Sequence, residues 1–216
     1  VQLSLVSYYE SVKDTINYNK AIEKLVTNVN IDSSTTLSIM NMLVRNDLQT
    51  QSDSTKMLSL FDKILSLPQA DVAMMELCAR YMVTLDVPKH RIIPVLEGML
   101  QINPENELAR NQLLNYAIED NDDKAIINIC KPAVDYSAPN PIYYYFLGVA
   151  YYQQDSLQLS MNVFQKALQK VTKDTDLNLI TNIYSILGDL YHDFGYNDKA
   201  YEAYDSCLIY KPEAAM

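Results

Sequence analysis

Hydrophobic and small residues recur every three or four positions along most of the chain, which is the spacing of one face of an α-helix. The segment PIYYYFLGVAYYQQDS, residues 141–156, shows the pattern most clearly. Tyr144, Gly148 and Tyr151 lie four and then three positions apart, so one helix face carries all three. Because the glycine has no side chain, a second helix can approach closely between the two rings. The segment therefore predicts an α-helix that packs tightly against a neighbour.

The expected neighbour follows after a short polar turn, residues 153–156. Its stripe consists of Ser160, Phe164 and Ala167, again with small residues beside a large one. Neither helix can bury its apolar stripe alone, so we expect an antiparallel pair of helices that stacks on further pairs.

The pattern returns 40 residues later, where Leu147-Gly148 recurs as Leu187-Gly188. Self-similarity with a period of about 20 to 50 residues is typical of solenoid repeat proteins. The other matched positions are Tyr144 with Tyr184, Tyr151 with Tyr191, Ser160 with Ala200, Phe164 with Tyr204 and Ala167 with Cys207.

Upstream segments carry the same spacing in a weaker form. A stripe of Ile92, Leu96 and Met99 belongs to a unit that starts near Ala73, and another unit starts near Glu107. The segments MLSLFDKILSLPQ and NKAIEKLVTNV each predict one more helix. The six expected units cover approximately residues 2–37, 38–72, 73–106, 107–140, 141–174 and 181–214.

Two features interrupt the regular pattern. Pro94 and Pro132 fall inside expected second helices, where each removes a backbone donor, so we expect a local kink or a late helix start at both. The last two units are six residues further apart than the others, around VTKDTDLNLITN, which predicts a longer loop or an extended helix start.

These motifs resemble the tetratricopeptide repeat, a helix–turn–helix unit of about 34 residues, in a bacterial-type array. Pro104 in QINPEN lies where such a unit typically ends. The resemblance covers nearly the whole chain. It implies an all-α fold in which about twelve helices form an α–α superhelix, a right-handed solenoid of about six units, within one array over residues 1–216.

The resemblance also implies a function, because in this family one stripe of each first helix lines a concave groove. We expect a non-enzymatic scaffold that binds a peptide or a partner protein there. In the aromatic segment Tyr144 and Tyr151 are expected to fill the core, and Tyr143 to pack on the preceding unit. The expected groove residues are Leu77, Tyr81, Asn111, Asn115, Tyr145, Val149, Tyr152, Asp189 and His192. The alternative is a structural array that mainly self-assembles or forms part of a larger complex or envelope assembly.

The charge of the chain argues against nucleic acid as a partner. The formal net charge is −10, and no stretch concentrates the Lys and Arg that phosphate neutralisation requires. The longest apolar runs fall well short of the ~20 residues that a membrane-spanning helix needs. We therefore expect a protein or peptide partner and no membrane-spanning segment.

The sequence contains no recognisable catalytic or metal-binding motif. The chain has no GxSxG, P-loop, GxGxxG or HExxH motif, and His90 and His192 are too far apart in sequence to form a local ligand pair. The acidic run EDNDD, residues 119–123, lacks the glycine of a calcium loop, so a solvated turn is expected. We predict no enzyme activity, no metal and no cofactor. The cysteines, expected to be buried hydrophobes, are Cys78, Cys130 and Cys207.

The ends of the sequence raise two further expectations. The chain begins at Val1 without an initiator methionine or a signal-peptide pattern, so we expect a fragment. Its compartment stays open between the cytoplasm and, for a lipoprotein parent, the bacterial cell envelope. Near the C-terminus, Tyr201, Tyr204 and Leu208 are expected to contact another copy of the chain or a following segment, which predicts self-association through the last unit.

Overall fold

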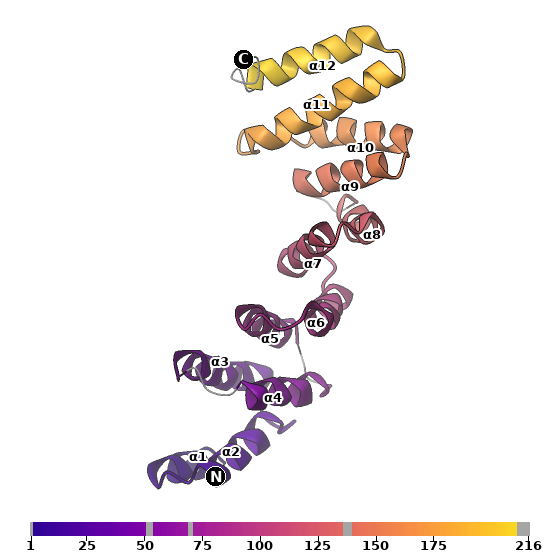
Figure 1. Cartoon of the computed structure of the whole chain (residues 1–216). Helices are drawn as coiled ribbons and strands as arrows, with labels where there is room; N and C mark the ends of the chain where they lie inside the picture. The colour runs from indigo at the N-terminus through magenta and orange to yellow at the C-terminus, as the bar shows by residue number, and fades with distance from the viewer. Residues whose placement is uncertain (1, 51–53, 69–70, 136–139, 211–216) are drawn as a thin grey trace. The chain divides into compact units, whose positions relative to one another are not determined.

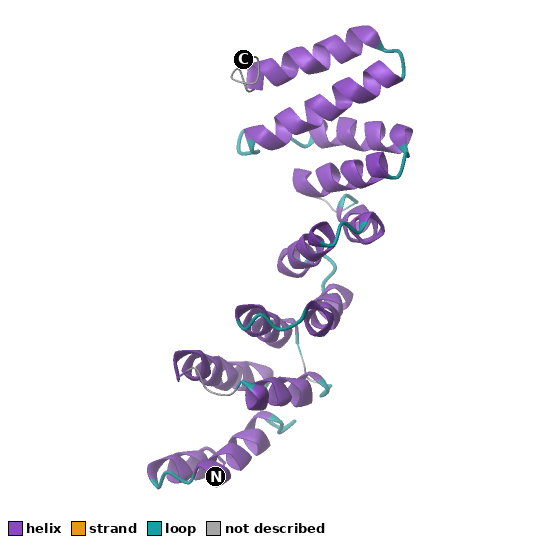
Figure 2. Cartoon of the chain, in the orientation of Figure 1, coloured by secondary structure: helices purple, strands orange, loops and turns teal. Residues whose placement is uncertain are grey.

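The fold is described from a computed structural model of the chain, for residues 2–50, 54–68, 71–135 and 140–210 (Figure 1). These residues form twelve α-helices and no strand (Figure 2). The predicted all-α fold is therefore confirmed.

The helices belong to two compact units, Val1–Ala109 and Arg110–Met216. The first unit contains α1 (Gln2–Ser11), α2 (Thr15–Val26), α3 (Ser33–Thr50), α4 (Thr55–Leu65), α5 (Val72–Thr84) and α6 (Lys89–Ile102). The second unit begins within α7 (Glu107–Glu119) and continues with α8 (Asp123–Ala133), α9 (Pro141–Gln153), α10 (Leu157–Gln169), α11 (Leu177–Asp193) and α12 (Asn197–Tyr210).

The first helices of the later pairs begin close to the expected unit starts. Helix α5 begins at Val72, α7 at Glu107 and α9 at Pro141. Helices α3 and α11 begin several residues before the expected 38 and 181, at Ser33 and Leu177. A loop and an extended first helix thus together occupy the VTKDTDLNLITN segment. The division into repeat units itself stays a prediction.

Short polar side chains start several of the helices by accepting a hydrogen bond from an N–H group of the first turn. Asp122 in the EDNDD run caps α8 in this way, which confirms the expected turn. The neighbouring Asn121 has a φ of 52°, in the left-handed region that asparagine tolerates in turns. The other such caps among the described residues are Asp14, Asp32, Asp71, Asn106, Asn140 and Asp176.

An aromatic ring lies directly on a glycine in each of the last two helix pairs. A Cβ atom built on Gly148 would lie 2.7 Å from the ring of Phe164, and one built on Gly188 would lie 2.3 Å from the ring of Tyr204. Ser160 adds a hydrogen bond from its Oγ to the carbonyl oxygen of Gly148, at 2.8 Å. The close approach expected from the sequence is confirmed in both pairs.

The aromatic cluster of α9 divides between two packing surfaces. Tyr144 is buried in the core formed with α10 and α11, and its hydroxyl donates to the carbonyl oxygen of Val134 at 2.9 Å. Tyr143 is buried on the α7 and α8 side, where its hydroxyl donates to Oδ1 of Asn111 at 2.8 Å. The packing of Tyr143 on the preceding helix pair is confirmed. Tyr151 is half-buried against the same α7 and α8 core.

Neither internal proline delays the start of its helix. Helix α6 begins at Lys89 and runs through Pro94, and α8 begins at Asp123 and runs through Pro132 to its last turn. Both proline side chains are exposed, so the rings leave the packed faces of the helices undisturbed. A late helix start is thus not found at either proline, because packing of the opposite face holds each helix together despite the missing donor. The other alternative, a local kink, stays a prediction.

Replacing Gly148 with alanine tests the contact with Phe164. Alanine favours a helix over glycine by about 1 kcal/mol, but overpacking a core costs about 1–3 kcal/mol. Because the Phe164 ring is fully buried, we expect Gly148→Ala to lower the free energy of unfolding by about 1–2 kcal/mol, measured by urea denaturation.

Gly98 on α6 offers the matched control, because a Cβ atom there meets only the Met75 side chain at 3.7 Å. Gly98→Ala is expected to leave stability unchanged or to raise it by about 0.5–1 kcal/mol. Equal effects at the two glycines would contradict the proposed role of the ring contact.

The three free thiols should differ in reactivity. Burial raises the pKa of the Cys78 and Cys130 thiols to about 12, and it also raises the pKa of the half-buried Cys207 thiol. At about pH 8 we expect Cys207 to react slowly with a chromogenic disulfide, and Cys78 and Cys130 to react only after unfolding. Rapid reaction of all three thiols in the folded protein would contradict the described core.

Candidate functional site

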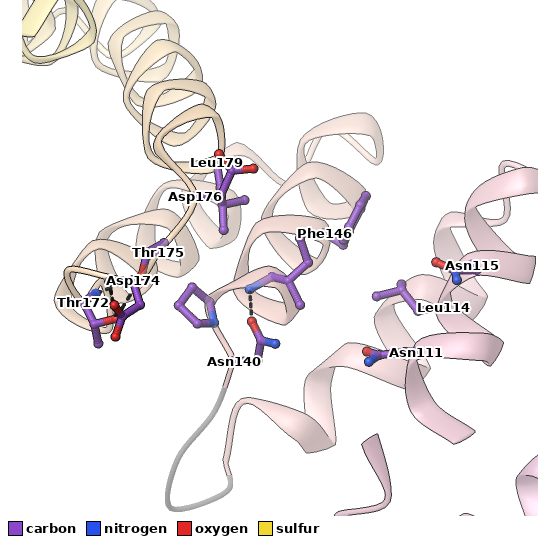
Figure 3. A pocket seen from close by; sticks show the side chains of 12 residues that line it. Asn111, Leu114, Asn115, Asn140, Phe146, Thr172, Asp174, Thr175, Asp176 and Leu179 are labelled. Atoms are coloured by element: carbon purple, nitrogen blue, oxygen red, sulfur yellow. Dashed lines mark hydrogen bonds between the residues drawn. The ribbon is translucent and has the colours of Figure 1, made fainter. Parts of the chain in front are cut away.

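The second unit contains an open cavity of about 660 Å³, bounded by α7, α9 and the segment that leads into α11 (Figure 3). Its size falls in the range of about 300–1,000 Å³ that is typical of ligand pockets. The lining residues are Asn111, Leu114, Asn115, Asn140, Pro141, Ile142, Phe146, Thr172, Asp174, Thr175, Asp176 and Leu179.

Apolar side chains from three helices form the floor of the cavity. Leu114 of α7 is buried, whereas Ile142 and Phe146 of α9 are half-buried and one helical turn apart. Leu179 adds an apolar group from the first turn of α11. The ring of Phe146 rests edge-on against Tyr145, with centroids 5.2 Å apart, which supports it from behind.

Two exposed amides stand on the α7 side of the cavity. Asn111 and Asn115 lie one helical turn apart, so their side chains share a face. The Oδ1 atom of Asn111 accepts the hydrogen bond from Tyr143, which orients the amide and leaves its NH₂ group as a donor. This pair can therefore hydrogen-bond to the backbone of a bound chain.

The opposite rim is a short acidic loop that is held by its own hydrogen bonds. The backbone N–H of Thr172 donates to Oγ1 of Thr175 at 2.9 Å, and the N–H of Asp174 donates to Oγ1 of Thr172 at 3.3 Å. Asp176 then caps α11 by accepting from the N–H of Asn178 at 2.9 Å. Asp174 and Asp176 thus bring two exposed carboxylates to the rim.

The cavity includes only part of the expected groove. Asn111 and Asn115 line it, but Tyr145 and Val149 pack instead against the core between α9, α10 and α11. The Tyr145 ring lies 6.2 Å from the ring of Phe164. Helix α9 is rotated so that Ile142 and Phe146, rather than Tyr145 and Val149, face α7.

The other expected groove residues of the second unit lie outside the cavity. Tyr152, Asp189 and His192 are exposed, but none of them lines it. Asp189 accepts a hydrogen bond from the Tyr204 hydroxyl at 2.8 Å, which assigns it to the contact between α11 and α12 and raises the pKa of Tyr204 to about 12. The Nδ1 atom of His192 lies 3.9 Å from a carboxylate oxygen of Asp193.

Leu77 and Tyr81 belong to the first unit. Tyr81 is 1% exposed, and its hydroxyl donates to Asp47 of α3 at 2.5 Å. Burial, together with this hydrogen bond, raises the pKa of Tyr81 to about 12. The expectation that Tyr81 is partly exposed in a groove is wrong, because α5 packs this face against α3 and α4. Leu77 is half-buried.

The sequence reasoning missed the α9 wall and the acidic loop. One signal for the loop was available, because the six-residue excess between the last two units falls on the segment that includes residues 172–176. The rotation of α9 left no comparable signal, since Tyr145 and Phe146 are adjacent and both aromatic.

Two other kinds of site are absent from the described part of the chain. It contains no cluster of three or more histidine, cysteine or acidic side chains that could hold a metal ion. None of the helices in the described ranges combines the length and apolar character needed to cross a bilayer.

Comparison with known proteins identifies the fold of the chain. No protein-family model and no curated protein sequence matches the chain. Among solved structures, it is similar to YrrB, "a TPR protein with an unusual peptide-binding site", with a TM-score of 0.58 at 16% identity over 90% of this chain and 94% of that one. The chain has the fold of the tetratricopeptide-repeat proteins.

Two further structures share this tetratricopeptide-repeat fold with the chain. MamA (residues 41 to the end) from Desulfovibrio magneticus RS-1 matches with a TM-score of 0.55 at 15% identity, over 82% of this chain and 96% of that one. A chain of the Naa15/Naa10 complex bound to HypK-THB matches with a TM-score of 0.52 at 12% identity, over 98% of this chain but only 37% of that one. At these identities the likeness concerns the fold alone.

Proposed function

We propose that the chain is a non-enzymatic scaffold that binds an extended peptide segment of a partner protein in the cavity of the second unit. The observation that carries the proposal is the combination, in one cavity, of an apolar floor, two exposed amides and an acidic rim. Each of these three features recognises a different part of a peptide.

The apolar floor selects one bulky side chain of the partner. Ile142 and Phe146 present aliphatic and aromatic surface that is only partly covered by the protein itself, and the buried Leu114 lies beside them in the lining. Burying a leucine or phenylalanine side chain is worth about 1.5–3 kcal/mol. The floor therefore supplies most of the affinity.

The amides hold the backbone of the segment in an extended conformation. The NH₂ group of Asn111 can donate to a peptide carbonyl, and Asn115 can both donate and accept. Two amides one turn apart on a helix fix the direction of the bound chain more than they add affinity, since each neutral hydrogen bond contributes only about 1 kcal/mol.

The acidic rim favours a basic residue beside the apolar one. Asp174 and Asp176 are exposed, and the chain as a whole carries a net charge of −10. A lysine or arginine of the partner would be attracted to this rim, with a contribution that salt screens. The preferred segment is thus extended, with a leucine or phenylalanine next to a basic residue.

Two of the similar structures support a scaffold role. The structure of YrrB is described as having an unusual peptide-binding site, and the Naa15/Naa10 complex holds a further protein segment, HypK-THB. The lining groups of the cavity are amides, hydroxyls, carboxylates and apolar side chains, a set suited to recognition.

Peptide binding can be tested with an immobilised library in which a central leucine or phenylalanine is flanked by lysine or by glutamate. We expect saturable binding of the lysine-flanked peptides only. For the best peptide, Phe146→Ala should weaken binding at least about tenfold, equal to about 1.4 kcal/mol, as measured by fluorescence anisotropy. Asp174→Asn should weaken binding at low salt and reduce its salt dependence.

Tyr152 offers a matched control, because it lies on the same helix and is exposed but does not line the cavity. Tyr152→Ala should leave the affinity unchanged. The proposal fails if no peptide binds saturably, or if Phe146→Ala and Tyr152→Ala weaken binding to the same extent.

A further inference from the structure

Helix α12 exposes an apolar stripe that borders its contact with α11. Tyr201, Tyr204 and Leu208 lie three and four positions apart, and their exposed fractions are 70%, 36% and 43%. Ala200 and Ala203 are buried against α11, and one edge of the Tyr204 ring also contacts α11 at Gly188. Three large apolar side chains on one helix face form a patch that water solvates poorly.

The chain itself shows what covers the same face in the preceding helix pair. The matching residues, 40 positions earlier, are Met161, Phe164 and Leu168 on α10. Met161 is 6% exposed, Phe164 is 0% exposed and Leu168 is half-buried. All three belong to the core that α11 closes with Ile183, Leu187 and Leu190. The cover is thus the first helix of another pair, with apolar residues three or four positions apart.

Helix α1 has the properties of such a cover. It is the first helix of its pair, packs on α2 and exposes Leu5 and Tyr8, and Val12 is exposed directly after its last turn, where its N–H donates to the carbonyl oxygen of Tyr8 at 3.1 Å. These side chains are three and four positions apart, so they form one stripe that lies on a different side from the half-buried Val6 and Tyr9. Among the described residues, the α12 stripe has no cover of this kind, and α1 is a helix that can supply one.

Charge favours this pairing over contact between two copies of α12. Helix α12 carries Asp198, Glu202 and Asp205 against the single base Lys199, so two α12 helices face to face would bring like charges together. Helix α1 carries only Glu10 as a charged residue. Pairing α12 with α1 avoids most of the repulsion.

We propose that α1 of a second copy of the chain docks on the stripe formed by Tyr201, Tyr204 and Leu208. The contact joins two different surfaces, so it is heterologous. The assembly then keeps one unused α1 stripe at one end and one unused α12 stripe at the other, so it grows with concentration unless it closes into a ring.

Sedimentation and light scattering of single-site variants test this proposal. The wild-type chain should increase in average mass with concentration. Tyr8→Lys and Leu208→Lys should each remain at the mass of one chain, because each loses one of the two surfaces. An equimolar mixture of the two variants should form a one-to-one dimer, since the intact α12 stripe of one variant meets the intact α1 stripe of the other.

Ile209→Lys is the matched control, because Ile209 is exposed on α12 but lies about 100° around the helix from Leu208. It should associate as the wild type does, and circular dichroism should show that all variants keep their helix content. A wild-type chain that stays monomeric up to high concentration would overturn the proposal. Continued association of Tyr8→Lys alone, or a mixture that does not dimerise, would also overturn it.

Discussion

The contact of an aromatic ring with a bare glycine backbone sets the distance between the helices of the last two pairs. In α9 and α10 the ring of Phe164 occupies the space that a Cβ atom on Gly148 would need, and in α11 and α12 Tyr204 does the same at Gly188. The ring fills the core, and it fits only because the glycine has no side chain. Neither residue can therefore change size alone. The same requirement at both pairs explains why the sequence repeats there.

This close packing also determines the walls of the cavity. The rotation of α9 is fixed by two contacts. One face packs against Phe164, and Tyr143 hydrogen-bonds to Asn111 of α7. Ile142 and Phe146 are then directed to the cavity. The site is therefore a consequence of core packing, and the acidic loop before α11 adds a charged rim to an otherwise apolar surface.

The helices and their core could be predicted from the sequence, because three- and four-residue spacing fixes which residues share a helix face. Gly148 and Phe164 are the clearest example. The groove was harder to predict. Asn111 and Asn115 line the cavity, but Tyr81 is buried and Tyr145 packs on the core. Which side of a helix stays open depends on two neighbouring helices at once, and a repeat counted along one chain carries no information on that rotation.

A double-mutant cycle on Gly148→Ala and Phe164→Leu tests most directly whether the ring contact fixes this helix pair. If the added methyl group is harmful only because it meets the ring, the smaller leucine should relieve it. We then expect the double variant to be more stable than the sum of the single effects by about 1 kcal/mol or more, measured by urea unfolding. Effects that add within about 0.3–0.5 kcal/mol would show that the two residues act independently, which would contradict this account.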